Sequence, residues 1–160
     1  MHSLDMPISS FSALNPGAEM RLGDQLFRYD KAMTEKAYAG IQVDGAAECG
    51  CTYCRNFIAQ RATVYPASFR ALLDELGIDA AKEGEVYECG PAEDDRCFYG
   101  GWLFFTGQII ERGEHHVRQD GMEFWINGGR KLPAPNGDFG LDLLALNFTM
   151  TIPWVLSEKP

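Results

Sequence analysis

Leu143-Leu-Ala-Leu-Asn-Phe-Thr-Met-Thr-Ile152, near the end of the chain, is the stretch that decides the fold. Its apolar side chains recur at every second position, at Leu144, Leu146, Phe148, Met150 and Ile152. Asn147, Thr149 and Thr151 lie between them, so the period is the two-residue period of a β-strand. We therefore expect this strand to lie in an antiparallel sheet with one buried face and one face toward water.

The rest of the sheet and its helices follow from similar patterns. Cys97 to Ile110 includes the run Cys-Phe-Tyr-Gly-Gly-Trp-Leu-Phe-Phe, which is apolar on both faces, as in a central strand. Further strands are expected at 37–43, 85–89 and 122–126, and a helix from Thr52 to about Ala62. The clearest helix has its apolar stripe at Phe69, Leu72, Leu73 and Leu76. The prediction is an α+β fold: an antiparallel sheet of four to six strands with about two helices packed on one face.

Chain length and net charge limit the classes of protein and partner that fit this sequence. The 160 residues fit one domain, here 24–160, after an irregular lead-in at 1–23. Neither a secretory signal nor a membrane span is recognisable, so a soluble, cytoplasmic protein is expected. The net charge of −9 argues against nucleic-acid and membrane partners and favours a protein partner with a basic surface.

Several segments resemble a group of small bacterial hypothetical proteins. They are Cys54-Arg-Asn-Phe57, Leu76-Gly-Ile-Asp79 leading to Lys82-Glu-Gly-Glu-Val-Tyr87, Tyr99-Gly-Gly-Trp102 and Pro153-Trp-Val-Leu156. The similarity spans most of residues 50–157. It implies a recurring domain, but it assigns no activity and no catalytic residue.

The chemistry that the sequence suggests lies mainly in Cys49-Gly-Cys51-Thr-Tyr-Cys54. The spacing of Cys51 and Cys54 lets two thiolates reach one tetrahedral zinc ion. Cys89 and Cys97 are the expected further ligands, because a hairpin between their strands would bring them together. Cys49, His115 and His116 are additional candidates. The sequence therefore predicts either no cofactor or one structural zinc ion.

Two other interpretations of the cysteines remain open. A C-x-x-C pair at a helix N-terminus is typical of thiol–disulfide chemistry, in which Cys51 would attack and Cys54 would resolve. Alternatively, these cysteines are small buried side chains that only pack. The adjacent residues His115 and His116 are expected to be exposed or locally hydrogen-bonded, because neighbours in an extended chain point to opposite faces.

An aromatic set offers a different kind of site. Two glycines at 100–101 lie between Tyr99 and Trp102, and Trp125 is a further aromatic candidate. A small ligand could approach the backbone at the glycines and stack on one of these rings. A β-bulge packed among core aromatics is the alternative interpretation. Three hypotheses of function follow: a non-enzymatic acidic interaction module of adaptor, inhibitor or immunity type, a thiol enzyme or redox sensor, and a small-ligand binder.

Overall fold

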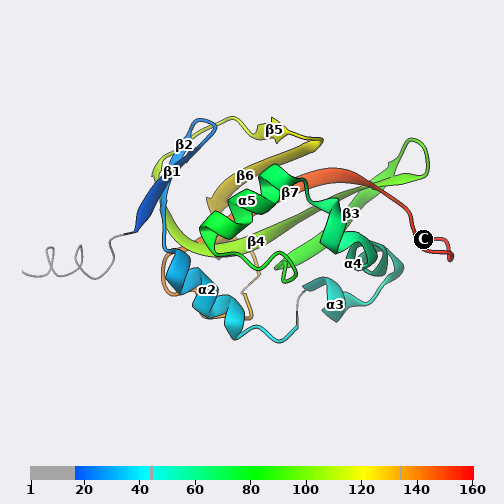
Figure 1. Cartoon of the computed structure of the whole chain (residues 1–160), viewed down its shortest axis with the longest axis horizontal. Coiled ribbons are helices and arrows are strands. Elements are labelled where there is room, and N and C mark those ends of the chain that lie inside the picture. Colours follow the sequence, from blue (N-terminus) through cyan, green and yellow to red (C-terminus); the bar gives the residue numbers. More distant parts are fainter. Residues whose placement is uncertain (1–16, 44, 134) are drawn as a thin grey trace, which may run out of the picture.

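The computed structural model describes residues 17–43, 45–133 and 135–160, and it contains a seven-stranded antiparallel sheet (Figure 1). The strands are β1 (Ala18–Leu22), β2 (Gln25–Tyr29), β3 (Glu85–Ala92), β4 (Arg96–Glu111), β5 (Val117–Gln119), β6 (Met122–Gly128) and β7 (Leu143–Pro153). The α-helices are α2 (Lys31–Ala39), α3 (Gly45–Cys49), α4 (Thr52–Val64) and α5 (Ala67–Leu76). The α+β class is confirmed. The sheet has more strands than the four to six predicted, and the described residues form four α-helices instead of two.

Strand β4 is the longest strand and pairs with three others. One edge pairs with β7 along residues 96–106. The other edge pairs with β3 over residues 96–102 and with β2 over residues 107–111. Helix α2 fills the gap between β2 and β3: the Thr34 hydroxyl accepts the Thr106 N–H at 2.9 Å, and the Tyr38 hydroxyl donates to the Phe104 carbonyl at 2.7 Å. Side chains thus satisfy backbone groups that no strand reaches.

The strand predicted for 37–43 is wrong, because its first residues belong to α2. Asp30 caps this helix, and its side chain accepts the Met33 N–H at 3.0 Å. The buried residues are Thr34, Ala37 and Tyr38, at the i, i+3, i+4 spacing of a helix. Tertiary burial along this face outweighs the short alternating pattern that suggested a strand.

Helices α4 and α5 cover one face of the sheet, as Figure 1 shows for α5 in front of β4 and β7. Phe69 of α5 lies with its ring centroid 5.2 Å from that of Phe124 and 6.0 Å from that of Phe148. On the opposite face, the segment after β6, which begins with the 3-10 turn Gly129–Lys131, places Phe139 against Phe104 at 6.1 Å. Helices therefore cover one face of the sheet, as predicted, and an irregular segment packs on the other face.

The N-terminal lead-in predicted for 1–23 is described only from residue 17 onward. Ala18–Leu22 form strand β1, which pairs with β2 through a turn at Gly23. Residues 1–16 lie outside the described part of the chain. Within the described residues, no helix is both long and apolar enough to cross a lipid bilayer.

Glu83 connects several elements from a fully buried position. Its carboxylate forms an ion pair with Arg61 Nη2 at 2.9 Å and accepts a hydrogen bond from the Tyr65 hydroxyl at 2.7 Å. Its backbone carbonyl accepts the N–H of Gly45, the first residue of α3, at 3.1 Å. One residue between α5 and β3 therefore fixes both α3 and the C-terminal half of α4.

Replacing Glu83 with Ala is expected to lower the free energy of unfolding by about 3–5 kcal/mol, because it leaves the largely buried Arg61 guanidinium without its carboxylate. Urea denaturation measures this change. Glu93→Ala, in the exposed turn between β3 and β4, removes the same charge and should have little effect. Equal unfolding free energies for the two variants would contradict the anchoring role of Glu83.

Candidate functional site

Cys49, Cys51 and Cys54 converge where the chain passes from α3 to α4. Cys49 is the last residue of α3, and Gly50 adopts a left-handed conformation with φ of +70°. Cys51 is the N-cap of α4, and Cys54 lies in the first turn of that helix. Because glycine adopts positive φ at little cost, the Gly50 turn brings the two flanking cysteines to the same side of the loop.

The three sulfur atoms form a compact group. All three Sγ atoms lie within 4.8 Å of one another. Cys49 and Cys51 are exposed, whereas Cys54 is buried. Two thiolates on one tetrahedral zinc ion, each at about 2.3 Å from the metal, lie about 3.8 Å apart. Small side-chain rotations would therefore bring the sulfurs to the spacing of metal ligands.

The electrostatic environment favours a thiolate at Cys51. The Cys54 N–H donates to Cys51 Sγ at 3.4 Å, and this hydrogen bond is the main reason that the pKa of Cys51 lies below the usual value of a thiol. The N-terminus of α4 adds its partial positive charge. Arg55 places a guanidinium close by, since its Nε donates to the Gly50 carbonyl at 3.3 Å. Cys51 is thus an exposed thiol that is readily ionised.

Cys54 differs from Cys51 although only two residues separate them. Its side chain points into the interior, and this burial raises the pKa of its thiol well above the ordinary range. Its hydrogen bonds with the other two cysteines act in the same direction. In the metal-free protein Cys54 is therefore a protonated thiol at neutral pH, and a bound cation would be needed to hold it as a thiolate.

Buried amide side chains of Asn56 and Gln60 hold the middle of α4 against the end of β7. Asn56 Nδ2 donates to the Pro153 carbonyl at 3.2 Å, and Asn56 Oδ1 accepts the Val155 N–H at 2.8 Å. Gln60 Nε2 donates to the same Pro153 carbonyl at 2.8 Å. The Tyr99 hydroxyl donates to the Tyr53 carbonyl at 2.8 Å. These bonds place the first turn of α4, and with it Cys51 and Cys54, at a fixed position on the sheet.

The structure does not bring Cys89 and Cys97 to this cluster, nor to each other. A β-bulge between Glu88 and Gly90 leaves Cys89 without a partner in the β3–β4 ladder, so Pro91 lies opposite Cys97 instead. Cys89 is exposed and Cys97 is buried. Of the four predicted ligands, Cys51 and Cys54 therefore lie together, and the third cysteine beside them is Cys49.

The histidines also lie outside the cluster. His115 Nδ1 lies 2.7 Å from Asp24 Oδ2, and this contact is the main cause of a raised pKa of His115. His116 lies 3.2 Å from the Glu123 carboxylate and stacks on Trp125 with 4.0 Å between ring centroids. Both histidines are thus locally paired, as the sequence suggested.

The aromatic set divides between the two faces of the sheet. Tyr99 is fully buried on the face covered by α4. Trp102 and Trp125 both lie opposite Asn147, one on each side of β7, and so share the other face. The predicted group of Tyr99, Trp102 and Trp125 therefore cannot line one pocket, because neighbouring positions of odd and even number point to opposite faces of β4.

The C-x-x-C spacing identified Cys51 and Cys54 but not Cys49, which was only one of several candidates for a further ligand. The available signal was the Cys-Gly-Cys tripeptide itself, in which a central glycine permits the left-handed turn.

Cys51 is expected to react with iodoacetamide at lower pH than Cys89, in protein kept with reductant and chelator. Both residues are exposed. The pKa of the Cys51 thiol is lowered, whereas partial loss of contact with water and the nearby Glu88 raise the pKa of the Cys89 thiol. At neutral pH a larger fraction of Cys51 is thiolate, so it reacts faster. Peptide mass spectrometry across neutral and alkaline pH gives both midpoints. A Cys51 midpoint at or above that of Cys89 would contradict this electrostatic account.

Comparisons of the chain with protein-family models, with curated proteins and with solved structures find no match. The resemblance to a group of small bacterial proteins stays a prediction.

Proposed function

We propose that Cys49, Cys51 and Cys54 bind one soft divalent metal ion, with Zn²⁺ as the first candidate. The observation that carries this proposal is the convergence of three Sγ atoms within 4.8 Å of one another. Thiolate sulfur is a preferred zinc ligand, and oxygen-preferring ions such as Mg²⁺ and Ca²⁺ are disfavoured by such a set.

Three protein ligands supply three of the four positions of a tetrahedral zinc ion. Among the described residues, no further His, Cys, Asp or Glu side chain joins this group. Zinc sites with three protein ligands keep the fourth position for water or another molecule. Because Cys49 and Cys51 are exposed, that position would be open to solvent.

Charge balance supports the same proposal. Three thiolates and one Zn²⁺ carry a net charge of about −1. The N-terminus of the thirteen-residue helix α4 lies beside the sulfur atoms and offsets part of this charge, and the nearby Arg55 guanidinium, which is also ion-paired with Glu158, adds to this effect. For the protein as a whole, the net charge of −9 supports an acidic interaction module that recognises a basic protein surface, with the metal centre stabilising the α3–α4 turn.

Thiol–disulfide exchange is the second candidate, favoured by the pairing of an exposed helix-capping Cys51 with a buried Cys54. In this reaction the Cys51 thiolate attacks a substrate disulfide and expels one thiolate. Cys54 then loses its proton and attacks the Cys51 sulfur, which releases the second substrate thiolate. The substrate gains two electrons, and the protein becomes the Cys51–Cys54 disulfide.

Cys49→Ser separates the two candidates, because the metal site needs Cys49 and the exchange reaction does not. For a metal site we expect wild-type protein to bind about one Zn²⁺ per chain and to melt at higher temperature with the metal. Cys49→Ser should then lower zinc affinity at least tenfold, roughly the effect of losing a group that supports a ligand. Competition with a chromophoric chelator measures the affinity.

Cys89→Ser is the matched control, since Cys89 is an exposed cysteine away from the cluster. It should bind zinc like the wild type. Retention of full zinc affinity by Cys49→Ser, or no zinc binding by reduced wild-type protein, would refute the three-thiolate site. If the three-thiolate site is refuted and Cys49→Ser still reduces a disulfide substrate at the wild-type rate, thiol–disulfide exchange becomes the favoured function.

A further inference from the structure

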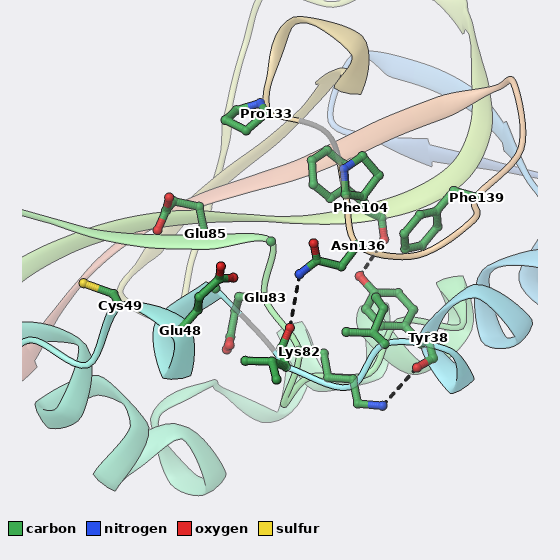
Figure 2. A pocket seen from close by; sticks show the side chains of 15 residues that line it. Tyr38, Glu48, Cys49, Lys82, Glu83, Glu85, Phe104, Pro133, Asn136 and Phe139 are labelled. Atoms are coloured by element: carbon green, nitrogen blue, oxygen red, sulfur yellow. Dashed lines mark hydrogen bonds between the residues drawn. The ribbon is translucent and has the colours of Figure 1, made fainter.

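A cavity of about 460 Å³ lies beside the α3 helix, and Cys49, at the end of that helix, forms part of its wall (Figure 2). Its walls come from the end of α2 and residues 41 and 43 after it, from α3, from residues 82–85, from β4, and from Pro133, Pro135, Asn136 and Phe139. The volume falls within the range of pockets that hold small ligands, about 300–1,000 Å³. The cavity and the proposed metal site share Cys49, whereas Cys51 and Cys54 do not line the cavity.

One end of the cavity is aromatic. Tyr38, Phe104 and Phe139 line it and are each almost fully buried. The ring centroid of Phe139 lies 5.2 Å from that of Tyr38 and 6.1 Å from that of Phe104. Figure 2 shows these three rings together, at some distance from the carboxylates. Because only 2–3% of each residue is exposed, the rings form the apolar floor of this end.

The other end carries the carboxylates of Glu48, from α3, and Glu85, from β3, as Figure 2 shows. Within the described part of the chain, neither carboxylate has an ion-pair partner. The nearby Lys82 is turned away, because its Nζ donates to the Tyr38 carbonyl at 2.9 Å and lies 3.8 Å from Asp79. The cavity thus has an excess of negative charge at one end.

These carboxylates do not form a metal site. Among the described residues, the cysteine cluster is the only group of three or more potential ligands with atoms within 4.8 Å of one another. Glu83, which also lines the cavity, uses its carboxylate for Arg61 and Tyr65. Two carboxylates without a third ligand match a larger cation with several separate donors, such as an ammonium or guanidinium group.

We propose that this cavity binds an organic cation with an apolar body, whose ammonium or guanidinium head lies between Glu48 and Glu85 and whose body lies against Phe104 and Phe139. The two ends of the cavity match the two ends of such a ligand. The acidic protein also attracts cations at long range. The ligand is either a free amine or the side chain of a lysine or arginine on a partner protein, and both share this chemistry.

Titration of wild-type protein with butylguanidinium and with its neutral analogue butylurea tests the charge requirement. Amide chemical shifts, followed by NMR, report affinity and location together. Butylguanidinium should bind at least about tenfold more tightly, because a charge-assisted hydrogen bond is much stronger than a neutral one. Shifts should concentrate at residues 41–43, 45–49, 82–85 and 135–139. Equal affinities for the two compounds, shifts elsewhere or no binding would overturn the proposal.

The double variant Glu48→Gln/Glu85→Gln keeps the shape of the cavity and removes its charge. It should lose at least about tenfold in butylguanidinium affinity, whereas the double variant Glu93→Gln/Asp95→Asn, in an exposed turn, should not. Unchanged affinity in the first variant would refute the role of the carboxylates. All titrations with butylguanidinium use metal-free protein, so failure here is distinct from failure of the metal site.

A short capped peptide with one central arginine distinguishes the two sources of the ligand. Binding of the peptide at least as tightly as butylguanidinium, with the same shifted residues, assigns the cavity to a partner side chain. Binding of butylguanidinium with exclusion of the peptide assigns it to a free small molecule. Failure of both ligands to bind would refute the cavity as a cation site.

Discussion

The buried carboxylate of Glu83 is the constraint on which the arrangement of the helices depends. An ionised carboxylate away from water costs several kcal/mol unless charged and hydrogen-bonding partners surround it. Arg61 and Tyr65, which lie four residues apart near the end of α4, supply those partners. Glu83 is therefore compatible with the fold only where α4 lies in one register against the turn before β3, and its carbonyl fixes the start of α3 in the same place.

The contacts of Glu83 with α3 and α4 also position the cysteine cluster. Arg61 fixes the C-terminal half of α4 at Glu83, and Asn56 and Gln60 fix the middle of the helix at the Pro153 carbonyl. Two sulfur atoms are thus positioned by α4 and the third by α3, with Gly50 as the joint between them. Because the backbone is already placed, a metal ion would need to order only side chains, and this lowers the entropic cost of binding.

Sequence reasoning located the parts of the fold that depend on local periodicity. Strand β7 and helix α5 follow directly from apolar spacing, and both were predicted close to their observed bounds. Tyr38 was placed in a strand because Ala37, Ala39, Ile41 and Val43 alternate with it and its neighbours, whereas its contact with β4 belongs to a helix. Membership of the cluster depended on the φ angle of Gly50 and on the bulge at Cys89, which are tertiary features. The cavity combines segments almost a hundred residues apart, so no local pattern could indicate it.

The central claim is that three thiolates from one turn hold a single metal ion with one position left open. X-ray absorption at the zinc edge, on reduced protein loaded with one equivalent of Zn²⁺, measures the ligand shell directly. The structure predicts three sulfur neighbours at about 2.3 Å and one oxygen or nitrogen neighbour at about 2.0–2.1 Å. A shell of oxygen and nitrogen atoms without sulfur, or a fitted count of no more than one sulfur, would contradict the site.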